Sequence, residues 1–274
     1  MRQVLHHSHV PEDAARRPVE TALDAVTNEA ADGFGWTSSN WSGYAIQSNT
    51  VGKYDAIAAE WTVPQVQVTT QRRPATWWGR LLQWLRTLFV SSSSSTDSYS
   101  AAWIGIDGFN DNSLIQTGTA QSIVNGIPQY YAWWEILPSP ENAIDPSQYP
   151  VSGGDQVVAS ITRQTDGKWS ISMGNRTRGW VFQQTDLSYA GAQTSAEWVM
   201  EAPFVNGQVA ALSNYGQMTF RNCAVNGTDP YLQAAQGGVM LQNGEQVSTP
   251  SGPGPNGDSF TVQYGSTPPN RPSS

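Results

Sequence analysis

The side chains of this chain that could carry out chemistry are carboxylates and amides, because histidine is almost absent. The three histidines, His6, His7 and His9, lie at the very start of the chain, and none follows them. A serine or cysteine nucleophile of the Ser-His-Asp or Cys-His type needs an imidazole to accept its proton, so the remaining residues cannot support either. The usual zinc sites are excluded for the same reason. Hydrolytic chemistry would therefore have to use carboxylates and amides.

The sequence gives little reason to expect a metal or a cofactor. Its one cysteine, Cys223, cannot form a disulfide within the chain, and we interpret it as a small buried hydrophobic residue rather than a nucleophile. The run from His6 to His9 could bind a metal loosely, but a solvated N-terminus is the better interpretation. We expect no metal site and no cofactor.

Carboxylates, an amide and large aromatic side chains alternate along the stretch 101–136, which predicts three short strands separated by turns. Residues two apart on a strand share a face. One face therefore carries Trp103, Asp107, Leu114, Gln116, Tyr131, Trp133 and Glu135. The other is aliphatic and aromatic, with Ile104, Ile106, Ile115, Tyr130, Ala132, Trp134 and Ile136. We interpret the first face as a groove that grips a ligand and acts on it.

A second strand candidate, within 194–204, adds two more acids. Alternation places Glu197 and Glu201 on one face, together with Val199, and Trp198 and Met200 on the other. Two acids on one short strand face cost free energy unless they are solvated or used. Both are therefore candidate site residues.

The elements that would position these side chains are almost all strands. The chain shows ten or more short strand patterns, and Asp166-Gly167 between two of them is a strong hairpin signal. The 12 tryptophans suit a sheet with a broad binding face. We therefore predict an all-β protein built as a two-sheet antiparallel β-sandwich.

The body of the chain is expected to run from 38 to 265. Residues 1–37 differ in composition and are interpreted as an N-terminal arm or prosegment remnant, removed or displaced in the active form. The segment 71–99 is an insertion, in which 72–90 have an amphipathic helical pattern. That helix would pack outside the sandwich or contact a membrane or partner surface. Residues 266–274 are expected to be disordered.

Charge and hydropathy limit the partners and the location. Acids outnumber bases 22 to 14, so nucleic acid is an unsuitable partner. No apolar run is long enough for a transmembrane helix, and no signal-peptide core precedes the body. The acidic, lysine-poor composition nevertheless favours a secreted protein, and we expect a monomer.

Several motifs, in order, resemble the glutamic peptidases, or eqolisins. They are Ser39-Asn40-Trp41-Ser42-Gly43-Tyr44, Glu60-Trp61-Thr62-Val63-Pro64, the Trp-Ile-Gly-Ile-Asp run at 103–107, Leu114-Ile115-Gln116-Thr117-Gly118, Tyr131-Ala132-Trp133-Trp134-Glu135 and Ala196-Glu197-Trp198-Val199-Met200-Glu201. The resemblance spans about 38–264 and excludes the insertion. It implies a concanavalin A-like jelly roll of two bent sheets, a substrate groove on the concave face, secretion and activity in acid.

The resemblance also assigns roles to individual residues. Gln116 and Glu201 match the catalytic pair, and Trp103, Asp107 and Glu135 match supporting positions. Such a pair needs no histidine: a carboxylate can take a proton from water and return it, and an amide N–H can stabilise an oxyanion. Glu135 would orient the Gln116 amide, while Trp133, Tyr131 and Glu197 belong to the groove.

The chain departs from the fungal pattern at Ala120 and Tyr131, which replace acids, and in lacking disulfides. It is therefore more similar to prokaryotic members. Two other functions remain open from the residues. The chain could be a glycoside hydrolase that uses Glu135 and Glu201, or a binding module for carbohydrate or peptide without catalysis.

Overall fold

The computed structural model describes residues 33–68 and 97–273, which hold the whole predicted body apart from the insertion. Nearly all regular structure in these residues is strand. The strands are β1 (Trp36–Ser38), β2 (Trp41–Gln47), β3 (Ala56–Thr62), β4 (Ser98–Ile106), β5 (Ile115–Val124), β6 (Ile127–Ile136), β7 (Asn142–Ala143), β8 (Gln156–Arg163), β9 (Trp169–Asn175), β10 (Trp180–Leu187), β11 (Ser195–Glu201), β12 (Phe204–Val205), β13 (Gln208–Val209), β14 (Gln217–Val225), β15 (Gly237–Gln242), β16 (Glu245–Pro250) and β17 (Phe260–Tyr264), with a 3₁₀ turn, η3 (Ala234–Gln236). Most of the predicted arm and the helix predicted at 72–90 lie outside the described residues.

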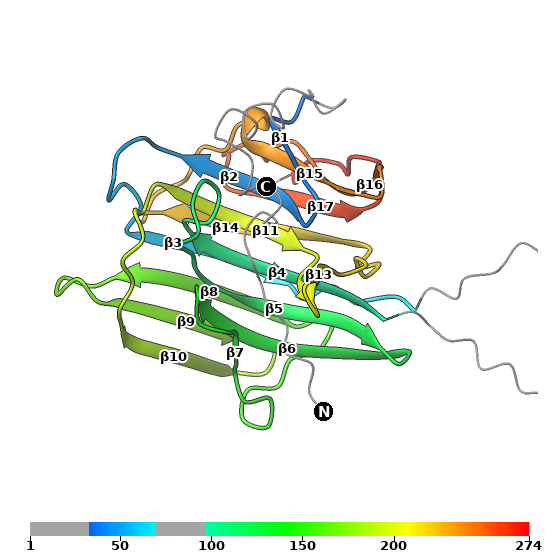
Figure 1. Ribbon diagram of the computed structural model, residues 1–274, viewed down its shortest axis with the longest axis horizontal. Helices are drawn as coiled ribbons and strands as arrows, with labels where there is room; N and C mark the ends of the chain where they lie inside the picture. Colours follow the sequence, from blue (N-terminus) through cyan, green and yellow to red (C-terminus); the bar gives the residue numbers. More distant parts are fainter. Residues whose placement is uncertain (1–32, 69–96, 274) are drawn as a thin grey trace, which may run out of the picture.

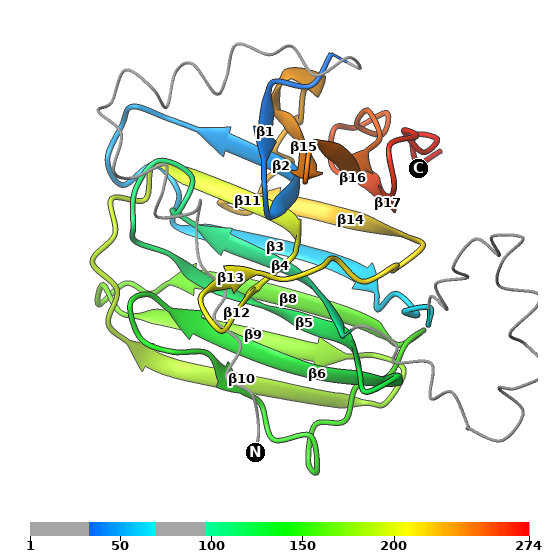
Figure 2. The same cartoon turned by 45° about the vertical axis from the view of Figure 1, so that its right-hand side comes forward.

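A 15-stranded sheet makes up most of the fold, and it bends back on itself to form two facing layers (Figures 1 and 2). β12 and β13 form a separate two-stranded sheet. One layer has the order β10-β9-β8-β3-β14 and the other the order β2-β11-β4-β5-β6, while β17, β16 and β15 join them at one edge. Neighbours on this path pair antiparallel, and β1 adds to β15 in parallel. The predicted two-sheet antiparallel sandwich is confirmed, with the two layers continuous through that edge.

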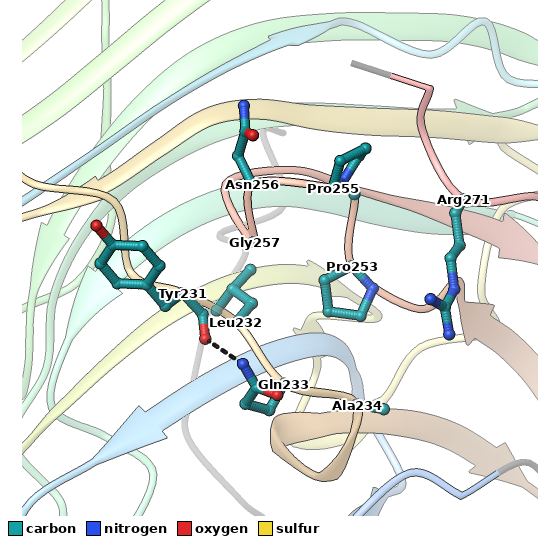
Figure 3. A pocket seen from close by; sticks show the side chains of 10 residues that line it. Tyr231, Leu232, Gln233, Ala234, Pro253, Pro255, Asn256, Gly257 and Arg271 are labelled. Atoms are coloured by element: carbon teal, nitrogen blue, oxygen red, sulfur yellow. Dashed lines mark hydrogen bonds between the residues drawn. The ribbon is translucent and has the colours of Figure 1, made fainter.

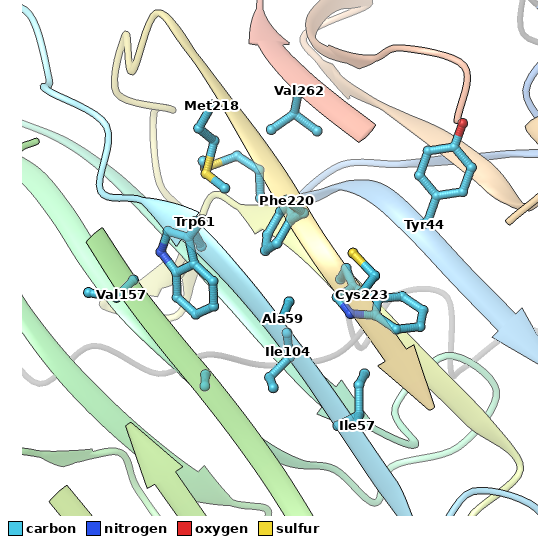
Figure 4. Close-up of a cluster of buried hydrophobic side chains, with 14 of the residues drawn as sticks. Tyr44, Ile57, Ala59, Trp61, Ile104, Val157, Met218, Phe220, Cys223 and Val262 are labelled. Atoms are coloured by element: carbon cyan, nitrogen blue, oxygen red, sulfur yellow. The ribbon is translucent and has the colours of Figure 1, made fainter. Parts of the chain in front are cut away.

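The main core lies between the two layers (Figure 4). Aromatic rings meet there, with Trp61 and Phe220 at 5.6 Å between centroids. Two indole N–H groups cross from layer to layer, from Trp61 to the Thr119 hydroxyl at 3.0 Å and from Trp198 to a backbone carbonyl of β3 at 3.0 Å. Cys223 is a free, buried member of this core, as predicted, and burial raises the pKa of its thiol.

The predicted alternation of faces is confirmed where it matters for the site. Side chains from 104, 106, 115 and 132 enter the main core, whereas those from 101, 103, 114, 120, 133 and 199 form a second cluster on the opposite face of the same layer. Trp36, Trp41 and Ala45 join that second cluster from β1 and β2. The site layer is therefore packed with apolar side chains on both faces.

The chain after β17 takes a defined course, whereas the sequence predicted disorder from 266. Pro272 is buried, and the Arg271 guanidinium lies so close to Gly252 that a Cβ there would meet its Nε at 2.5 Å. Within 33–68 and 97–273, no helix is long and apolar enough to cross a membrane.

Candidate active site

The face on which the sequence predicted a groove, here called the groove face, is built on five neighbouring strands, and their register places its side chains in three rows. Side chains paired across antiparallel strands point to the same side, so each row crosses the layer from β2 to β6. The rows are Trp41–Glu201–Ala101–Ala120–Tyr131, Gly43–Val199–Trp103–Gly118–Trp133 and Ala45–Glu197–Gly105–Gln116–Glu135. The acids Glu201, Glu197 and Glu135 and the amide Gln116 thus lie in the two outer rows, whereas Asp107, also predicted on this face, lies after β4 and in none of them.

The carboxylate of Glu201, at the end of β11, is fully buried. The indole N–H of Trp103 donates to one of its oxygens at 2.7 Å, and the side-chain amide of Asn40 donates to the other at 3.4 Å. Trp103 is held in turn by Trp41, whose ring meets it edge-on at 4.9 Å. Both donors are neutral N–H groups, and each holds one oxygen of the Glu201 side chain.

Gln116 and Glu135 are direct partners across β5 and β6. The Gln116 amide donates to a Glu135 oxygen at 2.7 Å, and both side chains are fully buried. A carboxylate only accepts, so this contact fixes the amide with its nitrogen toward Glu135. The structure thus brings together the two residues for which the sequence predicted an orienting contact.

Gly118, in the middle row, lets β4 and β5 pack with the Trp103 ring between the outer rows. A Cβ at 118 would lie 2.3 Å from the Ala102 carbonyl oxygen and 2.5 Å from Cβ of Trp103. Any other residue would therefore push Trp103 away from Glu201. This gives the glycine two residues after Gln116 a structural role.

Asp107 lies just after β4, at a φ of 68°, and supports a loop. Its carboxylate accepts hydrogen bonds from the backbone N–H groups of Gln193 and Thr194, both at 2.8 Å, and from the Tyr189 hydroxyl at 2.7 Å. The strand alternation placed Asp107 beside Trp103 on the groove face. The structure instead turns its carboxylate to the 189–194 loop.

Glu197 is the most unusual acid of the groove face. It is fully buried, and neither carboxyl oxygen has a hydrogen bond of good geometry among the described residues. Burial raises its pKa well above the ordinary value, nearby Asp107 and Asp111 add to that rise, and the Ser195 hydroxyl opposes it in part. Glu197 is therefore expected to stay protonated at pH values at which an ordinary glutamate is ionised.

Tyr131 and Trp133 continue the groove face onto β6. Trp133 is fully buried, whereas Tyr131 is half-buried and its hydroxyl lies 3.4 Å from a Glu141 oxygen. Sequence reasoning missed Asn40 as a site residue. It precedes β2, 161 positions from Glu201, so the only signal was its place in a motif.

Other features of the described residues do not compete for the role of active site. No group of three or more His, Cys, Asp or Glu side chains among them is arranged to hold a metal. A hollow of about 350 Å³ lies elsewhere, between 231–234, 253–257 and Arg271 (Figure 3). Its lining has one charged side chain and no paired acid and amide.

Comparison with known proteins finds one matching family model and several similar peptidases. A family model described as the Peptidase A4 family matches residues 39–264. Aspergillopepsin-2 of Aspergillus niger is 26% identical over 251 residues, which cover 88% of this chain and 81% of that protein. A crystal structure of scytalido-glutamic peptidase with a peptide-based transition-state analogue gives a TM-score of 0.60 at 22% identity, over 82% of this chain and 98% of that chain. The crystal structure of aspergilloglutamic peptidase from Aspergillus niger gives 0.52 at 25% identity, over 61% and 99%.

Proposed function

The chain belongs to the peptidase A4 family of glutamic peptidases, and from this premise we propose that Glu201 and Gln116 form its catalytic pair. The observation that carries the proposal is the arrangement on one sheet face. Glu201 is held by the Trp103 indole at 2.7 Å, and Gln116 is held by Glu135 at 2.7 Å, diagonally across the Trp103 row. A peptide bond lying over Trp103 would have the acid on one side and the amide donor on the other.

In the proposed reaction, Glu201 acts as a base and then as an acid. Its carboxylate takes a proton from water as the water oxygen bonds to the carbonyl carbon. The carbonyl oxygen becomes an oxyanion, which accepts a hydrogen bond from the Gln116 amide. An amide nitrogen has two N–H groups, so one can stay on Glu135 while the other serves the oxyanion. The carbon–nitrogen bond then breaks, and the proton on Glu201 passes to the leaving nitrogen.

The proposed substrate is a polypeptide, bound in an extended form beside the half-buried Tyr131. Support comes from scytalido-glutamic peptidase, whose crystal structure holds a peptide-based transition-state analogue. We further propose activity in acid, which the resemblance to glutamic peptidases implies, and secretion as a monomer. Within the predicted arm, removal or displacement is proposed only for 1–32, because Phe34 and Trp36 pack into the body. The insertion would lie outside the groove and end before β4, which begins at Ser98.

A glycoside hydrolase that uses Glu135 and Glu201 is the less favoured alternative. The two acids lie on β6 and β11, three strand spacings apart, and in different rows of side chains. Glu135 is also engaged by Gln116. The family match and this register both favour the peptidase.

The test is to incubate the purified protein at pH 3 to 5 with a denatured protein, with xylan and with glucan. Protein cleavage that is lost in Glu201→Gln, by a factor of at least about 10²–10⁴, is the expected result. Sugar release without protein cleavage would replace the proposal with the glycosidase, and binding without either would indicate a binding module. Near-normal protein cleavage by folded Glu201→Gln would contradict the assigned pair.

A further inference from the structure

Ser38, at the end of β1, has a hydroxyl whose hydrogen bonds can be fully assigned. Its oxygen accepts from the backbone N–H of Asn40 at 3.2 Å and from that of Trp41 at 3.1 Å. It also lies 2.9 Å from the side-chain oxygen of Asn40. Two backbone donors occupy the oxygen lone pairs, so the single O–H is left to donate to Asn40. The direction of this contact is thereby set.

That contact determines which way the Asn40 amide points. Because its oxygen accepts from Ser38, its nitrogen faces Glu201 and donates to the carboxylate at 3.4 Å. The backbone carbonyl of Asn40 also accepts from the N–H of Ala202 at 2.8 Å, directly after Glu201. Asn40 is fully buried. Asn40 thus contacts the end of β11 twice, with its side chain at Glu201 and with its backbone carbonyl at Ala202.

We propose that Asn40, oriented by Ser38, is a positioning residue that holds the Glu201 carboxylate in its reactive orientation. The proposal rests on the function proposed above. Trp103 holds one carboxylate oxygen and Asn40 the other, so the two donors together define the plane of the carboxylate. A carboxylate that must take a proton from water and return it to nitrogen needs this plane fixed.

The decisive variant is Asn40→Asp, which keeps the shape of the side chain and replaces the N–H donor with an oxygen. Asn40→Ala removes both, and Ser38→Ala removes only the orienting hydroxyl. The matched control is Ser42→Ala, on the following strand β2, where a buried hydroxyl donates to the Gly238 carbonyl at 3.2 Å. Melting temperature, kcat and KM on a quenched peptide are measured for each from pH 2.5 to 7, with Glu201→Gln in parallel.

We expect Asn40→Ala to lower kcat about 10- to 100-fold, the effect of one hydrogen bond to a charged group, with KM within about twofold. Asn40→Asp should fall off more steeply as pH rises than Asn40→Ala, because its own carboxylate then faces Glu201. Ser38→Ala should lie between Asn40→Ala and the wild type, and Ser42→Ala should keep the wild-type kcat and pH profile.

A wild-type kcat and pH profile in folded Asn40→Asp would overturn the inference. A loss of kcat that is explained by a lower melting temperature, and that Ser42→Ala shows to the same extent, would also overturn it. If Asn40→Ala does not fold, the isosteric Asn40→Asp decides alone. The parallel variant separates this inference from the function on which it rests. If Glu201→Gln is inactive and the Asn40 variants have wild-type activity, only the positioning role is rejected. If Glu201→Gln is active, the catalytic pair itself is rejected.

Discussion

The amide nitrogen of Gln116 lies 2.7 Å from a carboxylate oxygen of Glu135, its direct partner on the neighbouring strand. Both side chains are fully buried, so rotation of the amide would break this hydrogen bond without water to replace it. The Gln116 amide therefore has one defined orientation before any substrate arrives. A donor fixed in advance stabilises an oxyanion without reorganising during the reaction.

We predict that Gln116→Ala lowers kcat by about 10²–10³, as expected for loss of one oxyanion donor. Glu135→Gln should be milder, because its remaining carbonyl oxygen can still accept from Gln116. The measurement is turnover of a quenched peptide at pH 4 by folded protein. Equal inactivity of Glu135→Gln and Glu201→Gln, with active Gln116→Ala, would instead favour a pair of acids.

Replacing the indole that holds Glu201 should reduce turnover without preventing folding. Trp103→Phe keeps an aromatic ring and removes the N–H that donates at 2.7 Å, so we expect kcat to fall about tenfold or more. The matched control is Trp169→Phe in the main core, whose buried N–H has no partner among the described residues. Equal kcat for the two variants would show that the Trp103 N–H has no role in turnover.

Glu197 should make the fold less stable as the pH rises. Its folded pKa is raised above the ordinary 4.5 by burial, with Asp107 and Asp111 nearby and Tyr54 and Tyr189 facing it. The native state therefore holds a proton that the unfolded chain releases. That stabilising contribution is complete below about pH 4.5 and is lost as the pH rises, at about 1.4 kcal/mol per unit until the folded pKa is reached.

The test is urea unfolding of wild type and Glu197→Gln between pH 3 and 7. A glutamine cannot ionise, so the variant should match the wild type near pH 3.5 and exceed it increasingly toward pH 7. If the urea midpoints of the wild type and of Glu197→Gln differ by the same amount at every pH, Glu197 does not cause the pH dependence of stability. The result would bear on stability alone, whatever the catalytic role of the groove.

Asp155 should make the fold more stable as the pH rises, the opposite of the effect of Glu197. Its pKa is lowered: burial alone would raise it, but hydrogen bonds from Arg178, Asn175 and the Ser152 N–H outweigh that effect. The stabilisation is present above the ordinary carboxyl pKa and is lost as the pH falls. Asp155→Asn should therefore lower the free energy of unfolding by about 1–3 kcal/mol at pH 6 and by less at pH 3. Calorimetry at the two pH values checks this, and an equal loss at both would contradict it.

The layers and most strands could be predicted because each one shows its own alternation of side chains. Trp103 and Ile104 point to opposite faces, as their neighbours in sequence require. The paired strands β15 and β16 were missed. Gly237 and Gly238 begin β15, and the Trp36 ring fills the space where a Gly238 side chain would lie. That stabilisation is tertiary and leaves no local signal.

The site was predictable only in part for the same reason. Gln116 and Glu135 belong to consecutive strands, and the tight turn at Asn125-Gly126 sets their register. The contacts of Glu201 come from remote segments, and no local pattern places Asn40 beside it. Asp107 likewise looked like a groove acid, because its left-handed backbone conformation is not visible in strand alternation.

The contacts at Glu201 join residues far apart in the sequence, and this affects how incompletely folded molecules are exposed to digestion by folded ones. Trp103 is 98 positions and Asn40 is 161 positions from Glu201, and such distant pairings form slowly because long loops must close first. Catalytic competence should therefore appear only with the slowest refolding phase. Incompletely folded molecules would be cleavable by finished ones yet unable to cleave, so the yield of refolded enzyme should fall as mature enzyme is added to the refolding mixture.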